Sequence, residues 1–250
     1  MALCGRKQNA DMLSPFSFQP TLIIRLAAWL GIMASLASPA ADGSWLSGQT
    51  GTLNWSDPAN WTGGIVPGAV SGGSSGDTAT FGSNTAATLI TIDSGRIVLN
   101  LTFNGTNAAG AFTLGSAGVN LGPTLRLSSG GTALSQPGTL VPVTVHAPLV
   151  IEPASPTGNG SYTFTNNSTT APDAFTNNNL YKMNLLGDIS GGVTTGSITL
   201  NFTGTAGVRG ADASANIVSG LISNGGAAGG LGISVTGSGG GNFGAWSFTN

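Results

Sequence analysis

The side chains that could do chemistry are few and scattered in this chain. His146 is the single histidine, and the single cysteine, Cys4, lies close to the N-terminus. A general base needs a nucleophile or a carboxylate held beside it, and the residues around His146 supply neither. A zinc site needs three or four His, Cys or carboxylate ligands. We therefore expect no metal site and no cofactor, and we expect His146 to be a strand residue with a solvated ring.

The carboxylates are also dispersed along the sequence. Enzymes that hydrolyse glycosidic bonds hold two carboxyl groups about 5 to 9.5 Å apart, but no Asp-Asp or Asp-x-Asp pair occurs after residue 41. Asp57 precedes Pro58 and is expected to start a turn by accepting a backbone N–H. The sequence thus predicts that the protein is not an enzyme, with a polysaccharide lyase or hydrolase as the alternative. The other dispersed carboxylates are Asp77, Asp93, Glu152, Asp173, Asp188 and Asp212.

Three tryptophans, Trp45, Trp55 and Trp61, lie within 17 residues and are separated by Gly, Asn, Asp and Pro. Indole faces stack on sugar rings, so these side chains could form a platform for a carbohydrate ligand. Alternatively they form a small core or cap, because each buries a large area and the segment has few other large apolar groups. We favour the structural interpretation and keep the three residues as candidate carbohydrate contacts.

The composition predicts an all-β chain. Only 6% of the residues are charged, compared with about 25% in typical soluble domains. Glycine accounts for 41 of the 250 residues, and short runs rich in Val, Ile, Thr and Phe recur between the Gly and Asn turns, a pattern typical of strands. After residue 40 the sequence contains four Lys and Arg residues and eight carboxylates, so the net charge of this part is −4. This charge excludes a surface that neutralises a nucleic-acid backbone.

Residues 1–40 are predicted to be an export signal. Arg6, Lys7 and Arg25 precede an apolar run of 11 residues, Leu26–Leu36, and small residues follow, with cleavage expected after Ala37 or Ala40. The run is too short for a membrane span of about 20 residues, although an uncleaved anchor is the alternative. We expect a mature chain at the cell surface, in the outer membrane or outside the cell, without a membrane span and without disulfides.

Strand-like runs recur along the rest of the chain, and most alternate apolar residues with Thr, Ser or Asn. A parallel β-solenoid accounts for this pattern by stacking its rounds. A β-sandwich is the alternative, and Asn104-Gly105 favours a hairpin locally. We predict a solenoid with an irregular, Trp-rich N-terminal β cap over 41–110 and a repeat region over 111–250. The predicted strands include 88–92, 97–103, 111–114, 124–127, 140–152, 161–164, 181–186, 197–202, 217–222 and 231–235.

The order of motifs resembles the N-terminal part of autotransporter-associated β-strand repeat proteins, which are large exported bacterial proteins. The resemblance rests on the tryptophan segment 54–61, on Val66-Pro67-Gly68, on 76–81 and 98–103, and on the Gly-rich segments 216–225 and 237–248. It implies a passenger-like surface or secreted segment with no shared catalytic residues. Because members of the family continue for many repeats, we expect a chain that is truncated within a repeat at Asn250.

These observations predict a non-enzymatic, exported β-repeat scaffold of the adhesin type. Its expected partners are components of the cell surface or a polysaccharide. The alternatives are a carbohydrate-binding module that uses Trp45, Trp55 and Trp61, and a polysaccharide-active β-helix.

Overall fold

The structure is a computed structural model that describes residues 41–107, 109–137, 141–168, 182–193, 195–205, 216–225, 229–237 and 246–249. These residues belong to one compact unit, Ala40–Asn250. The predicted export signal, residues 1–40, lies outside the described residues. Within them the chain is all-β, apart from two short 3₁₀ helices, η1 (Pro58–Asn60) and η2 (Thr62–Gly64).

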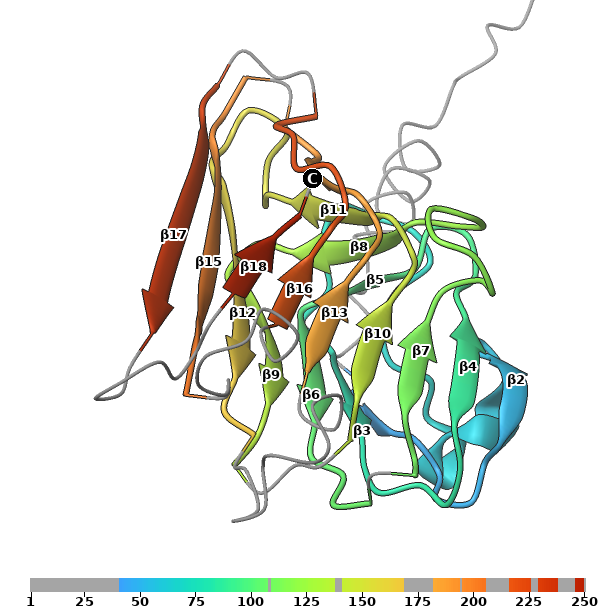
Figure 1. Cartoon of the computed structure of the whole chain (residues 1–250). Coiled ribbons are helices and arrows are strands. Elements are labelled where there is room, and N and C mark those ends of the chain that lie inside the picture. The colour runs from blue at the N-terminus through green and yellow to red at the C-terminus, as the bar shows by residue number, and fades with distance from the viewer. Residues whose placement is uncertain are drawn as a thin grey trace, which may run out of the picture. The chain divides into compact units, whose positions relative to one another are not determined.

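The strands form three sheets in which the strand order follows the chain, so that the colour in Figure 1 changes in one direction along each sheet. Sheet 1 consists of β1 (Gly43–Ser44), β3 (Thr78–Phe81), β6 (Asn100–Phe103), β9 (Gly131–Ser135), β12 (Gly160–Asn166), β15 (Ile198–Gly204) and β17 (Leu231–Gly237). Sheet 2 consists of β2 (Gly51–Asn54), β4 (Thr88–Thr91), β7 (Phe112–Leu114), β10 (Val143–Val145), β13 (Met183–Leu185), β16 (Asn216–Val218) and β18 (Trp246–Phe248). Sheet 3 consists of β5 (Ile97–Val98), β8 (Leu125–Ser128), β11 (Leu149–Glu152) and β14 (Ile189–Gly191).

Consecutive strands lie in different sheets. From β4 to β15 the chain visits sheets 2, 3 and 1 in turn, and each such passage is one round, whereas β2 and β16 are each followed by a strand of sheet 1. Every pairing between these named strands is parallel. The hairpin predicted at Asn104-Gly105 is therefore wrong, because β6 pairs with β3 and β9 while β7 lies in sheet 2. Hairpin pairing, which the alternative β-sandwich requires, is absent among the described strands. The parallel all-β arrangement is consistent with a solenoid-like fold.

The core forms because most strands alternate between apolar and small polar residues, which directs one set of side chains inward. In β12, for example, Tyr162 and Phe164 are buried between partly exposed neighbours. Parallel register then places like residues over each other: the Phe164 and Phe202 rings stack at 5.3 Å, and the Phe81 and Phe103 rings at 5.2 Å. Inward aromatic stacks thus connect one round to the next.

A predicted strand is too long where the chain turns a corner within it. The segment 140–152 was expected as one strand, but it forms β10 and β11 with a turn at His146–Pro148 between them. Small residues stack at this corner in successive rounds. A Cβ on Gly187 would lie 2.1 Å from the carbonyl oxygen of Ala147, and a Cβ on Gly220 would lie 2.0 Å from that of Gly187. The corner can repeat in each round because these residues bring the backbones into close contact.

Strands on both sides of residue 110 pair in the same sheets, since β4 pairs with β7 and β6 with β9. The boundary placed there from the sequence stays a prediction. Gly131 has a packing role in β9, because a Cβ at this position would lie 2.8 Å from the Tyr162 ring and 1.9 Å from the carbonyl oxygen of Leu99. The absent side chain makes room for the Tyr162 ring.

We predict that Tyr162→Phe stabilises the protein. The Tyr162 hydroxyl is buried and has no hydrogen-bond partner among the described residues. Removing a buried, unpartnered hydroxyl is expected to raise the free energy of unfolding by about 1–3 kcal/mol. Urea unfolding followed by circular dichroism measures this change. The outward-facing substitution Thr163→Ser is the control, with an expected change within about 0.5 kcal/mol.

The same variant tests a pH dependence. Burial raises the pKa of the Tyr162 phenol above the value of about 10 that it has in the unfolded chain. The unfolded chain releases this proton first, so the stability present below about pH 10 is lost as the pH rises further. The advantage of Tyr162→Phe should therefore grow between neutral pH and about pH 10.5. A lower urea midpoint for the variant at neutral pH would contradict the assignment.

Candidate functional site

The three predicted carbohydrate contacts form one buried aromatic cluster. The exposed fractions of Trp45, Trp55 and Trp61 are 5%, 0% and 1%. The Trp45 and Trp61 rings meet edge to face at 4.9 Å, and Trp55 lies 5.3 Å from Trp61. Phe81 contacts all three rings and joins them to the aromatic stack of sheet 1. The burial agrees with the core interpretation of these residues, since a sugar ring needs an open indole face on which to stack.

Hydrogen bonds fix the orientation of two of these rings. The Trp55 Nε1 donates to the carbonyl oxygen of Pro67 at 2.9 Å, and the Trp61 Nε1 donates to that of Trp55 at 2.6 Å. Asp57 starts the η1 turn by accepting from the amide of Ala59 at 2.9 Å, the role predicted from the sequence. The segment between β2 and β3 is therefore held both by apolar burial and by directed polar contacts.

Two charged residues attach this segment to the sheets. Asp77 accepts from the amides of Ala41 and Gly68 at 2.8 and 2.7 Å. Arg96, which is 4% exposed, forms an ion pair with Asp93 at 2.8 Å and donates to the carbonyl oxygens of Pro67 and Gly68. Both charges are used to hold backbone, so neither is directed at an open cleft.

All six described carboxylates after residue 40 have such partners. This arrangement differs from that of a catalytic pair, in which two carboxyl groups face the same bond of the substrate. Asp173 and Asp212 lie outside the described residues. The partners of the six are the Thr78 amide for Asp42, the Ala59 amide for Asp57, two amides for Asp77, Arg96 for Asp93, Arg126 for Glu152 and the Leu221 amide for Asp188.

His146 lies at the corner between β10 and β11, so the expectation that it is a strand residue is wrong. Its ring is partly exposed, and its Nδ1 lies 3.1 Å from the carbonyl oxygen of Ser116. Pro148 follows two residues later and cannot donate a ladder hydrogen bond, which is in keeping with a break between the two strands. The imidazole thus packs against the neighbouring corner, and no carboxylate bonds to it among the described residues.

Amide side chains tie together the corner between sheets 1 and 2. Asn166 Nδ2, at the end of β12, donates to Asn216 Oδ1 at 2.6 Å, and the same oxygen accepts from the Met183 amide at 3.0 Å. Lys182 precedes β13 and is also buried, and burial lowers the pKa of its ammonium group. These contacts join three strands and account for the buried polar residues as structural bonds.

The outer face of sheet 1 carries the most regular polar surface of the described chain. Most of its outward side chains form two ladders that cross the strands, and all members of these ladders are partly or fully exposed, while Ser161 and Thr199 form a shorter third row. Ladder a contains Thr78, Asn100, Thr132, Thr163, Asn201 and Ser234. Ladder b contains Ser44, Thr80, Thr102, Leu134, Thr165, Thr203 and Thr236.

This face is not among the sites predicted from the sequence, although the sequence contains a signal for it. The triplet of Thr, Asn or Ser, then an apolar residue, then Thr recurs with one triplet in most rounds. Each triplet contributes one side chain to ladder a, one that points inward and one to ladder b, and the inward side chain is buried in all of them except Val235. The triplets are Thr78-Ala79-Thr80, Asn100-Leu101-Thr102, Thr163-Phe164-Thr165, Asn201-Phe202-Thr203 and Ser234-Val235-Thr236.

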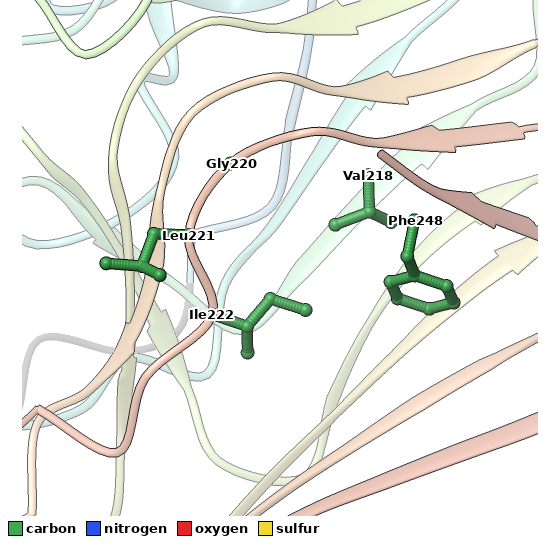
Figure 2. A pocket seen from close by; sticks show the side chains of 5 residues that line it. All are labelled: Val218, Gly220, Leu221, Ile222 and Phe248. Carbon is green, nitrogen blue, oxygen red and sulfur yellow. The ribbon is translucent and has the colours of Figure 1, made fainter. Parts of the chain in front are cut away.

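An apolar pocket lies at the last described strands of sheet 2. Figure 2 shows Val218 and Phe248, which are paired across β16 and β18, near Leu221 and Ile222 on the following turn. Its volume is about 340 Å³. Small-molecule sites combine an apolar lining with a few convergent polar side chains, and the lining here has apolar side chains and the backbone of Gly220 only. We therefore place the candidate site on the face of sheet 1.

No group of three or more His, Cys, Asp or Glu side chains that could hold a metal ion occurs in the part of the chain that the structure describes. In the same part, no helix is long and apolar enough to cross a membrane. Comparison with protein-family models, curated proteins and solved structures finds no significant match to the chain.

Tryptophan fluorescence tests the assignment of the aromatic cluster. We expect the native protein to emit at short wavelength, because Trp45, Trp55 and Trp61 are buried, and we expect polysaccharides to leave the spectrum unchanged.

Trp61→Phe should lower the urea midpoint, since it removes part of the ring contact and the hydrogen bond to the Trp55 carbonyl oxygen. The control, Trp246→Phe, changes a partly exposed ring outside this cluster. A saccharide-dependent shift that disappears in Trp61→Phe would instead favour the carbohydrate platform.

Proposed function

We propose that this chain is a non-enzymatic, exported parallel β-solenoid that serves as a surface or secreted scaffold of the adhesin type. In this proposal its rounds form a solenoid body, and the Trp45–Phe81 segment is the N-terminal cap. The outer face of sheet 1 is the surface offered to a partner. The proposed partners are components of the cell surface or a polysaccharide.

Two contacts support a capping role for the tryptophan segment. Ala69 forms an antiparallel bridge with Ile97 of β5, the edge strand of sheet 3, and Trp45 forms one with Trp61. An open edge presents unpaired N–H and C=O groups that can pair with another chain. Solenoids need closed ends for this reason. The contacts of Ala69, Asp77 and Arg96 cover part of the first round in the way that a cap requires.

The single observation that carries the scaffold proposal is the regular outer face of sheet 1, in which Leu134 is the only apolar residue of the two ladders. Six or more strands add one partly exposed side chain each to the same ladder. Regular repetition of this kind gives an extended surface of fixed geometry, which suits contact with another surface more than chemistry at one point. The use of the described carboxylates as structural acceptors further supports a non-catalytic role.

The resemblance to autotransporter-associated β-strand repeat proteins supports export and a passenger-like role. A carbohydrate-binding module based on Trp45, Trp55 and Trp61 is less well supported, because the three rings are buried. A polysaccharide-active β-helix would need two carboxylates free to face one substrate bond. The six described carboxylates each have a backbone or Arg partner instead.

Export is tested by expressing the full chain with its own first 40 residues in a Gram-negative host. We expect the protein outside the cytoplasm with a mature N-terminus at Ser38 or Ala41, as measured by mass spectrometry. Leu30→Arg places a charge in the apolar run and should block export and processing. Val70→Arg, at an exposed site of the mature chain, is the matched control and should leave both unchanged. Recovery of the unprocessed wild-type chain from the cytoplasm alone would contradict export.

A polysaccharide panel tests the non-enzymatic assignment. We expect incubation of the purified chain with plant, algal and bacterial polysaccharides to release no new reducing ends and no unsaturated ends. The heat-denatured protein provides the background. Release that depends on folded protein and is lost in Glu152→Gln would contradict the scaffold role and restore the polysaccharide-active alternative.

A further inference from the structure

We infer that the outer face of sheet 1 binds ice, with ladders a and b meeting the ordered water of the crystal surface. The inference goes beyond the proposed function, because it gives the same face a ligand other than the cell-surface components or polysaccharide proposed above. It depends on the proposed function only in that both use the outer face of sheet 1 as the surface that meets a partner. The spacing of the ladders, the chemistry of their side chains and their neutrality support it.

The spacing of the two ladders follows from strand geometry. Neighbouring members of one ladder lie on adjacent parallel strands, about 4.8 Å apart. The two ladders are separated by two residues along each strand, which is about 6.6 Å. A prism face of ice also presents oxygen atoms in a rectangular array with a shorter and a longer repeat, and the shorter repeat is close to the distance between strands. The ladders can therefore follow the crystal along the direction that crosses the strands.

The side chains of the ladders suit this partner. Threonine predominates, and it presents a hydroxyl that bonds water beside a methyl group that orders it. In the described chain the only hydrogen bond between side chains of these ladders is from Asn100 to Thr78, at 3.3 Å. The hydroxyls of residues such as Thr163 and Thr165 are thus available to water. Threonine is also β-branched with a restricted χ1, so little freedom is lost when the face meets an ordered surface.

The face is also neutral. No strand position of ladder a or b is a charged residue, whereas the outer side of sheet 3 carries the Arg126–Glu152 ion pair. The outer side of sheet 2 is less regular, because Leu89 and Ile217 lie in its ladder with Thr113 and Thr144. Ice carries no net charge, so a neutral hydrogen-bonding face complements it without stripping water from ions.

Other partners fit the same face less well. A polysaccharide surface is usually met by aromatic rings, and no aromatic residue stands in either ladder. Nucleic acid and anionic membranes need cations, which the face lacks. Only Leu134 interrupts ladder b with an apolar side chain, so the face offers no apolar patch for a protein partner. Ordered water is the ligand that its composition favours.

The test uses the purified chain and measures thermal hysteresis, the shape of ice crystals and partitioning into a growing ice front. Wild-type protein should show all three activities. Thr165→Tyr introduces a bulky side chain into the middle of ladder b and should lower the hysteresis about tenfold, because contact is lost over several repeats. Leu134→Thr completes the ladder and should raise the activity. Thr144→Tyr on sheet 2 is the matched control and should match wild type.

Circular dichroism and urea midpoints check that each variant is folded, and Thr165→Val keeps the shape while it removes one hydroxyl. Wild-type protein without ice activity would overturn the inference, as would equal activity of folded Thr165→Tyr and wild type. Binding to crystalline cellulose without ice activity would overturn it too and would assign the face to a polysaccharide. Because these assays use purified protein, their result is independent of the export assay that tests the proposed function.

Discussion

Parallel pairing in a fixed register is the constraint on which the rest of this structure depends. Each strand pairs with the strand of the previous round, so each residue lies over the residue that occupies the same place one round earlier. A slip by one residue would turn every inward side chain outward. The inward positions are therefore mostly apolar in each round, with buried polar residues such as Asn166 and Asn216 at strand ends held by hydrogen bonds, and the outward positions tolerate small polar residues. Core and surface are selected together.

The same constraint explains why the ends differ from the middle. A middle strand such as β12 has a partner on both sides, while an end strand leaves one side open. At the N-terminal end the tryptophan segment, Asp77 and Arg96 fill and hold the first round. In the last described rounds, Ile233, Val235 and Phe248 continue the inward pattern yet are 47%, 51% and 42% exposed. Burial of an inward residue thus requires a following layer as well as the right residue type.

The all-β class could be predicted from the sequence because alternation is a local property, whereas the parallel solenoid was only the favoured of two arrangements, the other being a β-sandwich. The turn chemistry of Asp57 is local as well, and it was also predicted. Register is not local, since Thr163 pairs with Thr132 and Asn201 in other rounds. The hairpin at Asn104-Gly105 and the unbroken strand over 140–152 were wrong for the same reason: tertiary pairing decided both. The outer ladders of sheet 1 became visible only when the register aligned their triplets.

The low number of charged residues follows from the repeated parallel register. A charged residue inside a stacked round would be buried without water, and a charged residue in an outward ladder would stand about 4.8 Å from like neighbours if the repeat were kept. Arg96 and Asp77 are buried but bond to backbone groups near the first strands, and Arg126 is paired with Glu152. The outward ladders of sheet 1 have no such charge repulsion, because their polar side chains are neutral hydroxyls and amides. Its regular polar surface is therefore the natural result of a repeated register, and that regularity is the property that a crystalline ligand can recognise.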